Sequence, residues 1–269
     1  MNHDHSTMYP FRLCAIALLL CITLFGTSLP VQAASQVSPK LEEQVLQVIR
    51  EHPDVILESV QGYQQRVQQQ LQQAQQAFVQ ELKTNPQAVI GESPTTGASQ
   101  SKIVMVEFSD FQCPYCGRAH KTVQRFMAKH QDQVTLTYKH YPLASIHPQA
   151  ISAAKAAWAA FQQGTFWQYH DVLFTQQEKL GESFYIETAK GLNLNVDQFN
   201  RDRNSQAAET AIIQDIQLAE SLGITGTPFF VMNGEVFTGA IELEEMEKRF
   251  TRVKQSLKEQ GTGNREQQL

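Results

Sequence analysis

Residues 103–116 read IVMVEFSDFQCPYC, and this stretch decides the fold. Its first six residues form an apolar run typical of a buried strand, and a helix-like stretch follows from Gly117 to His130. Cys113 and Cys116 therefore stand where a strand passes into a helix, at a spacing that lets one sulfur reach the other. The dipole and unpaired N–H groups of a helix N-terminus favour a thiolate at the first position. The pattern predicts a reactive cysteine.

A second signal, Thr227-Pro228, lies about 110 residues downstream in the segment GTPFF. A proline there can simply start a strand. The alternative is a cis Thr227–Pro228 bond, which occurs where a fold selects it and which would place the backbone of Thr227 beside Cys113 to pair with an extended substrate. Because the cysteine pair precedes it, we expect the cis bond. Together the two signals predict thiol–disulfide exchange.

The residues around the cysteines receive distinct roles. Cys113 is the expected nucleophile, and Cys116 the thiol that resolves the mixed disulfide. Pro114 suits a first helical turn, and the pair Pro114-Tyr115 is expected to tune the redox potential, at roughly 30 mV for each pKa unit. Glu107 has two interpretations: a buried carboxylate that passes a proton to Cys116, or a strand residue that points to an edge.

Three further side-chain groups are judged structural. We expect Asp110 to be exposed and to modulate the local field only. His140, His147 and His170 are expected to be capping or core residues. A zinc site is the competing interpretation of the cysteines, but tetrahedral zinc takes four ligands. Even with His120, one turn beyond Cys116, the set stays incomplete, so no metal is expected.

Composition and charge narrow the class of protein. The 269 residues carry a formal net charge of −5, and removing residues 1–33 takes away one acid and one base, so that charge is unchanged. No basic stripe of the kind that binds nucleic acid is present, so we expect no nucleic-acid partner.

The N-terminus predicts export. Arg12 precedes an apolar run over residues 13–29, and Val31 and Ala33 are the small residues of a cleavage site, so residues 1–33 are expected to be a cleaved signal peptide. An uncleaved membrane anchor is the alternative. Cys14 and Cys21 lie inside this leader, so the mature chain keeps only Cys113 and Cys116. An exported protein stapled by disulfides would carry several pairs, which makes the single pair catalytic.

Residues 34–90 are expected to form a helical extension. One helix should end near His52-Pro53, and a second should follow whose apolar residues recur every three or four positions: Val60, Tyr63, Val67, Leu71, Ala74, Phe78 and Leu82. Eleven of the residues from Gln61 to Gln80 are glutamine. The apolar stripe is expected to pair with another copy of the chain through residues 39–83, or to fold back on the catalytic domain. A partly disordered tract is the third interpretation.

The rest of the chain divides into a linker, a compact domain and a tail. Residues 91–101 are a linker by composition, residues 102–255 the domain, and residues 256–269 a disordered tail. Within the domain, strands at 103–109 and 134–138 flank the Cys113 helix, and helices follow between about 147 and 222, with a break near Asn204. Strands at 229–232 and 235–238 then form a hairpin about Asn233-Gly234, and a helix covers 243–258.

These motifs resemble the DsbA-like thioredoxin family of exported thiol–disulfide oxidoreductases. The resemblance rests on residues 106–116 and 223–234, with Tyr141-Pro142-Leu143, His147-Pro148 and the segment 163–167 between them, and it covers roughly residues 101–252. It implies an α/β thioredoxin fold with an inserted helical domain, here preceded by the α-helical extension. It also implies Cys113 as nucleophile, Cys116 as resolving thiol and Pro228 in cis, with no cofactor beyond the redox-active disulfide.

The helical extension is instead similar to the oligomerising stalks of suppressor-of-copper-sensitivity-type relatives and of disulfide isomerases. The expected function is a periplasmic or otherwise extracytoplasmic enzyme that forms or exchanges disulfides in exported proteins; the alternative is an oligomeric isomerase or chaperone that uses the stalk. A DsbB-like, VKOR-like or DsbD-like membrane protein is the expected redox partner. A scaffold without thiol chemistry and a metal-binding protein are the remaining hypotheses.

Overall fold

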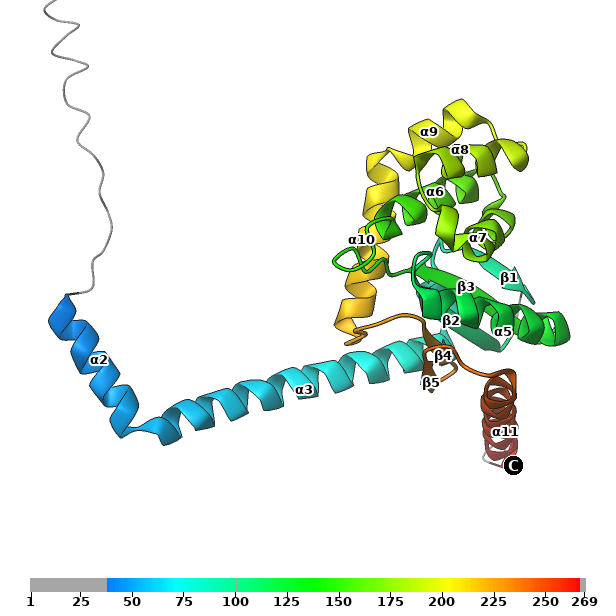
Figure 1. Cartoon of the computed structure of the whole chain (residues 1–269). Coiled ribbons are helices and arrows are strands. Elements are labelled where there is room, and N and C mark those ends of the chain that lie inside the picture. Colours follow the sequence, from blue (N-terminus) through cyan, green and yellow to red (C-terminus); the bar gives the residue numbers. More distant parts are fainter. Residues whose placement is uncertain (1–37, 100, 267–269) are drawn as a thin grey trace, which may run out of the picture. The chain divides into compact units, whose positions relative to one another are not determined.

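The computed structural model of the chain describes residues 38–99 and 101–266 (Figure 1). The predicted signal peptide, with Cys14 and Cys21, lies outside the described residues. The chain divides into two compact units, the first ending at Gly62 and the second beginning at Tyr63. Within the described part of the chain, no helix is both long enough and apolar enough to cross a bilayer.

The first unit contains helix α2 (Pro39–Glu51) and the beginning of α3 (Pro53–Thr84). Ser38 caps α2, because its Oγ atom accepts a hydrogen bond from the Leu41 N–H at 3.3 Å. No residue of α2 is buried. Large apolar side chains therefore face solvent on both helices of this unit: Leu41, Val45, Leu46, Val48, Ile49, Val55, Ile56, Leu57 and Val60.

A five-stranded sheet forms the centre of the second unit, in the order β1-β3-β2-β4-β5. Strands β2 and β3 are parallel and are connected by helix α5 (Pro114–His130), whereas the other neighbours are antiparallel. The turn between β4 and β5 has positive φ at both Asn233 (47°) and Gly234 (103°), as the hairpin signal predicts. The strands are β1 (Thr95–Gly97), β2 (Ile103–Ser109), β3 (Val134–His140), β4 (Phe229–Met232) and β5 (Glu235–Thr238).

The two faces of the sheet are covered by different helices (Figure 1). Alternation along β2 sends Ile103 and Met105 toward α5 and α11 (Leu243–Glu266), and sends Val104, Val106 and Phe108 toward the other face. There they pack with the end of α3, with α4 (Pro86–Ile90) and with α10 (Gln206–Ser221). Strand β2 is buried along its whole length, so the loop after it, which leads to Cys113, starts from a well-packed strand.

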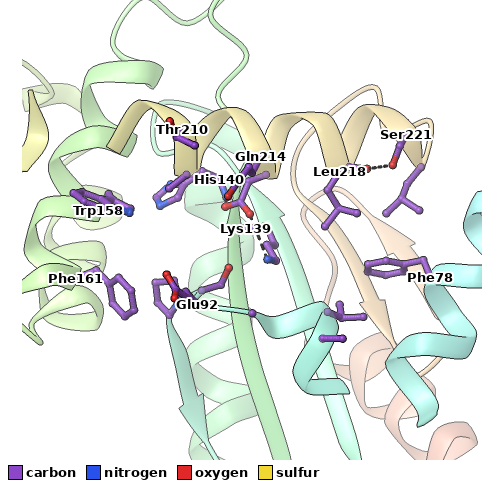
Figure 2. Close-up of a pocket in the computed structure, with 18 of the residues that line it drawn as sticks. Phe78, Glu92, Lys139, His140, Trp158, Phe161, Thr210, Gln214, Leu218 and Ser221 are labelled. Atoms are coloured by element: carbon purple, nitrogen blue, oxygen red, sulfur yellow. Dashed lines mark hydrogen bonds and ion pairs between the residues drawn. The ribbon is translucent and has the colours of Figure 1, made fainter. Parts of the chain in front are cut away.

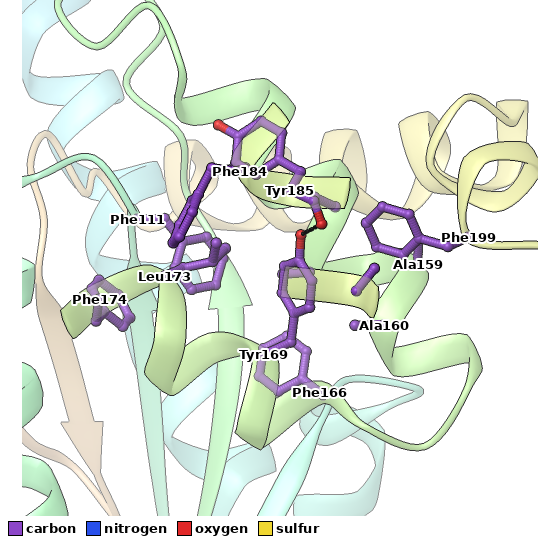
Figure 3. Packing of buried hydrophobic residues seen from close by; sticks show 14 of the residues in the cluster. Phe111, Ala159, Ala160, Phe166, Tyr169, Leu173, Phe174, Phe184, Tyr185 and Phe199 are labelled. Carbon is purple, nitrogen blue, oxygen red and sulfur yellow. Dashed lines mark hydrogen bonds between the residues drawn. The ribbon is translucent and has the colours of Figure 1, made fainter. Parts of the chain in front are cut away.

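The segment between β3 and β4 is a helical domain with its own core (Figure 3). Alanines of α6 allow aromatic side chains to pack closely, and the buried Tyr169 hydroxyl donates to the Tyr185 carbonyl at 3.0 Å. The predicted break lies at Asn204. With α10, its elements are α6 (Ala150–Gln162), α7 (Phe166–Thr175), η1 (Gln177–Lys179), α8 (Glu182–Gly191) and α9 (Val196–Arg203). The predicted thioredoxin fold with an inserted helical domain is confirmed.

Two predicted boundaries are wrong. Residues 91–101 are not only a linker, because Thr95–Gly97 forms β1 and pairs with β3. The Trp167 indole N–H also donates to the Thr95 carbonyl at 2.7 Å, which ties this edge strand to the helical domain. The tail predicted to be disordered from residue 256 continues α11 as far as Glu266. Extending an existing helix costs less than starting one, so α11, which is packed through Met246, Phe250 and Val253, continues past residue 256 although Gly261 and Gly263 have low helix propensity.

One part of the apolar stripe of α3 packs against the catalytic domain, and another part is exposed. From Leu71 onward it folds back on the catalytic domain: Leu71 lies against Gly223, and Phe78 and Leu82 are buried in the core. Gln75 reinforces this contact, because its amide donates to the Leu222 carbonyl at 2.8 Å. Tyr63 and Val67 remain exposed. The glutamine-rich tract is a continuous helix, so its interpretation as partly disordered is wrong.

Candidate active site

The cysteine pair begins helix α5. Cys113 has an extended backbone (φ −71°, ψ 122°) and is the N-cap residue, and Pro114 takes the first helical position. The Cys113 carbonyl accepts the first helical hydrogen bond, from the Gly117 N–H at 3.1 Å. Cys113 is 4% exposed and Cys116 is fully buried, and both carry free thiols.

The loop before β4 faces this helix terminus. The Thr227–Pro228 bond is cis, as expected from the sequence. The Cys113 thiol donates to the Thr227 carbonyl at 3.4 Å, so residues 114 positions apart in the chain meet at the reactive sulfur. The Pro228 carbonyl accepts the Gly239 N–H at 2.9 Å, which fixes the loop to the end of β5.

The pKa values of the two cysteines are shifted in opposite directions. The Cys116 side chain, which hydrogen-bonds to Cys113, lowers the pKa of Cys113 to about 5, with further help from Thr227 and from the backbone N–H groups of Tyr115 and Cys116, while burial opposes the shift. Burial raises the pKa of Cys116 well above its ordinary value, and the neighbouring Cys113 raises it further. At neutral pH the first sulfur is thus a thiolate and the second a thiol.

Glu107 lies in the middle of the sheet, where the structure favours the buried interpretation over the edge. It pairs in register with Tyr138 of β3 and Phe230 of β4, and is 2% exposed. Burial raises the pKa of Glu107 to about 7, and the Ser109 hydroxyl opposes this shift. Ser109 also lowers the pKa of Cys116, so the two groups share a neighbour. A carboxyl group that titrates near pH 7 can donate or accept a proton.

Asp110 is buried, and the expectation that it is exposed is wrong. Its carboxylate accepts three hydrogen bonds: from the Gln112 N–H at 2.8 Å, the Leu143 N–H at 2.9 Å and His147 Nδ1 at 2.7 Å. The Asp110 carbonyl accepts the Cys113 N–H at 3.1 Å. Asp110 therefore holds the loop that presents Cys113, and His147 is its partner.

Gln177 is a site residue that sequence reasoning missed. From η1 of the helical domain, its Nε2 atom donates to the Phe111 carbonyl at 2.7 Å and to the Cys113 carbonyl at 2.9 Å. A Cβ atom on Gly117 would overlap the Gln177 side chain, so the glycine makes room for this contact. No local signal marks Gln177, since its partners lie more than 60 residues away.

The rim of the site offers an exposed aromatic side chain. Tyr115 is 54% exposed, although it stands between the two buried cysteines. The Arg118 guanidinium lies over its ring, 4.4 Å from the centroid, which orients the ring by a cation–π contact. Tyr115 is therefore part of the exposed surface beside the cysteine pair.

A large cavity of this unit is separate from the cysteines, neither of which lines it. Its volume is about 1090 Å³, and it lies on the α10 face of the sheet (Figure 2). Lys139 and Asp215 form a buried ion pair on its wall at 3.4 Å. None of the predicted site residues lines it. Cys113 instead lies beside Thr227 and next to the exposed Tyr115.

Sequence matches to curated proteins cover part of the chain. The Na(+)/H(+) antiporter NhaA 3 of Salinispora tropica is 34% identical over 150 residues, which are 56% of this chain and 23% of that protein. The antiporter NhaA 1 of Salinispora arenicola is 32% identical over 155 residues, 58% of this chain and 24% of that protein. The chain thus spans about a quarter of the length of the curated relatives it matches.

Solved structures share the fold. A thioredoxin-like oxidoreductase from Silicibacter pomeroyi DSS-3 has a TM-score of 0.59 at 29% identity, covering 64% of this chain and 99% of its own. ScsC from Proteus mirabilis, in a transitional conformation, has a TM-score of 0.56 at 21% identity, covering 79% and 94%. The family model described as the DSBA-like thioredoxin domain matches residues 104–251, which are more than half of the chain and include Cys113, Cys116 and the Thr227–Pro228 bond. The chain therefore belongs to the DSBA-like thioredoxin domain family.

Proposed function

We propose that this protein is an extracytoplasmic thiol–disulfide oxidoreductase that uses Cys113 as its nucleophile and Cys116 as its resolving thiol. The observation that carries the proposal is the acidity of Cys113, whose pKa lies at about 5 beside the cis-proline loop. A thiolate that is stable at neutral pH is both a reactive sulfur and a good leaving group.

Disulfide formation then runs in two exchanges. A substrate thiolate attacks Sγ of Cys113 in the Cys113–Cys116 disulfide, a substrate–Cys113 bond forms, and Cys116 leaves and takes up a proton. A second substrate thiolate attacks the substrate sulfur of this mixed disulfide, and Cys113 leaves as a thiolate. The substrate loses two electrons and the enzyme gains them. The low pKa of Cys113 favours the second step, because the more acidic thiol leaves faster.

Glu107 supports the first exchange. Cys116 is a poor leaving group, because its thiolate is strongly disfavoured by burial. The carboxyl of Glu107 has a pKa of about 7, so it holds a proton in a large part of the molecules at neutral pH. We assign Glu107 as the group that returns a proton to Cys116, through the neighbourhood of Ser109.

Reoxidation requires a partner and no bound organic cofactor. We propose a DsbB-like, VKOR-like or DsbD-like membrane protein, which exchanges its own disulfide or dithiol with the Cys113–Cys116 pair. The exposed Tyr115 ring beside Cys113 is the surface available to such a partner. A structurally similar thioredoxin-like protein from Salmonella enterica serovar Typhimurium is described as periplasmic, which supports export of this chain.

Insulin reduction and oxidation of a model dithiol peptide test the proposal. Cys113→Ser is expected to abolish both activities with the fold intact by circular dichroism, and Cys116→Ser to accumulate a mixed disulfide with the substrate. Wild-type activity in Cys113→Ser would exclude the enzyme. Suppression of aggregation that survives Cys113→Ser, with no thiol activity in the wild type, would instead identify a chaperone or scaffold.

Disulfide isomerisation by an oligomer is the second candidate, favoured by the exposed apolar side chains of α2. Pairing of this face with further copies of the chain would bury it. A deletion that tests this candidate has to end at Gly62, because Phe78 and Leu82 further along α3 belong to the catalytic core. Deleting residues 34–62 from the mature chain is expected to reduce the particle mass to one chain and to remove refolding of scrambled ribonuclease, while dithiol oxidation persists. An unchanged mass of one chain before and after deletion would end this candidate.

A further inference from the structure

Three metal-ligating side chains meet between helices α5 and α7. His120 comes from α5, and His170 and Asp171 come from α7. The Asp171 Oδ1 atom lies 3.0 Å from His170 Nδ1 and 3.6 Å from His120 Nε2. One ligand atom from each residue lies within 4.8 Å of the others, and no other group of this kind occurs among the described residues.

The His120 ring points a polar atom into this cluster without a hydrogen bond. Its side chain is 3% exposed, and Nε2 has no hydrogen-bond partner among the described residues, because 3.6 Å to Asp171 is too long. A buried imidazole nitrogen without a partner costs free energy. The ring stacks on Phe174 at 5.1 Å, so its orientation is held by packing. Packing therefore aims an unused nitrogen at a carboxylate.

The second imidazole is held in the same way. His170 is buried, and it meets the rings of Phe111 and Tyr138 edge to face. Its Nδ1 atom faces the same carboxylate oxygen as His120 Nε2. The Asp171 side chain, in contrast, is 45% exposed, which opens one side of the cluster to water.

We propose that His120, His170 and Asp171 bind a divalent transition-metal ion of the zinc type, with water as the fourth ligand. Ligand atoms about 2.1 Å from zinc lie roughly 3.4 Å apart around a tetrahedron, and the separations of 3.0 and 3.6 Å bracket this value. Two histidines, one carboxylate and an open position form a set that zinc uses in proteins. The site is distinct from the Cys113–Cys116 dithiol.

Metal titration of the oxidised chain without residues 1–33 tests the site, because Cys14 and Cys21 are then absent and the Cys113–Cys116 disulfide removes the two remaining thiols as competing ligands. ZnCl₂ in calorimetry is expected to show one ion per chain and to raise the melting temperature. CoCl₂ is expected to give d–d absorption without a thiolate charge-transfer band. His120→Gln and Asp171→Asn should each weaken binding by more than the roughly 10–100-fold typical of outer-shell changes.

His130→Gln is the matched control. His130 also lies on α5 and contacts a carboxylate, Glu247, at 2.8 Å, but without a second histidine. Its loss is expected to leave zinc binding unchanged. Binding that survives both His120→Gln and Asp171→Asn would overturn the proposal, as would binding seen only in the reduced protein and lost in Cys113→Ser. Neither result depends on thiol-exchange activity, so the site and the proposed function fail separately.

Discussion

At the scale of single residues, the site is an unequal pair of sulfurs. Cys113 is surrounded by backbone N–H groups, the Thr227 carbonyl and the Cys116 thiol, whereas Cys116 is buried against the helical domain. These different surroundings lower the pKa of Cys113 and raise that of Cys116, and they set the order in which the two sulfurs act. It depends on a contact between the two, because the Cys116 side chain is the largest contributor to the acidity of Cys113.

Removing that contact is the first prediction. Cys116→Ala is expected to raise the pKa of Cys113 from about 5 toward its ordinary value of 9.0, since the thiolate loses its main hydrogen-bond donor. Cys116→Ser keeps a donor and should stay closer to the wild type. Thiolate absorbance in the ultraviolet, followed against pH in the reduced proteins, measures both. Equal pKa values in the two variants would assign the acidity to the helix terminus instead.

Glu107 gives a pH-dependent prediction for stability. Burial raises its pKa from 4.5 to about 7, so ionisation opposes folding. The loss of folding stability caused by this ionisation is absent below about pH 4.5 and grows between about pH 4.5 and 7. Above about pH 7 it is complete, and the pKa shift then corresponds to about 3 kcal/mol of lost stability. Glu107→Gln should therefore be more stable than wild type at pH 8 and similar at pH 4. Urea unfolding of the oxidised proteins at both values checks this, and a gain that is equal at both values would contradict it.

The residues found from sequence are those with a local signal. Cys113, Cys116 and Pro228 stand in recognisable segments, and the apolar run before them predicts β2. Asp110 had a partial signal, because an aspartate before a turn often accepts the N–H two residues on. Its other partners, Leu143 and His147, follow β3, and no sequence rule places them there.

At the scale of elements, the short helix η1 connects the helical domain to the active-site loop. Gln177→Ala is expected to lower the free energy of unfolding by about 1–3 kcal/mol, because the Phe111 carbonyl loses this donor and the Cys113 carbonyl keeps only the Gly117 N–H. Gly117→Ala should have a similar effect, since the added methyl group displaces the same side chain.

Their combination makes the third prediction specific. Because both substitutions break one contact, the double variant should lose little more than either single variant, whereas independent sites would add. Chemical denaturation of the four proteins gives this cycle. Additive losses would mean that Gly117 is needed for a reason other than Gln177.

The edge strand β1 could not be predicted from amino-acid composition. Residues 95–97 are Thr-Thr-Gly, too short and too polar for a strand signal, and their order comes from partners elsewhere. The Tyr138 N–H donates to the Pro94 carbonyl at 3.1 Å, and Trp167 donates to Thr95. The Asn233-Gly234 hairpin, in contrast, was predictable because its turn chemistry is local.

At the scale of the whole molecule, the apolar residues of the helical extension (α2 and α3) fall into two groups. Leu82 in α3, 1% exposed, belongs to the core of the catalytic unit, whereas Val48 in α2 is 57% exposed. Both residues are apolar in the sequence. Only the tertiary structure separates them, because Leu82 packs against a sheet face and Val48 faces solvent.

Substitution at the two positions is the fourth prediction. Leu82→Ala should destabilise the catalytic unit by about 2–5 kcal/mol, the usual range for a buried leucine. Val48→Asp should leave that unit unchanged and act on particle mass instead. Fluorescence of Trp158 and Trp167, both in the helical domain, reports unfolding, and light scattering reports mass. A large loss of stability of the catalytic unit in monomeric Val48→Asp protein would contradict this assignment of Val48 to a surface outside the catalytic core.

The contact between Cys113 and Thr227 has a consequence for client selection. When Cys113 carries its proton, the thiol donates to the Thr227 carbonyl. With a pKa of about 5, Cys113 has lost that proton at neutral pH, and in the disulfide it carries none. At neutral pH the carbonyl is thus open to the amide of an extended polypeptide in both redox states, and only acidification below about pH 5 would occupy it. Docking of a client at this backbone group is therefore controlled by protonation of one sulfur and not by the redox state of the pair.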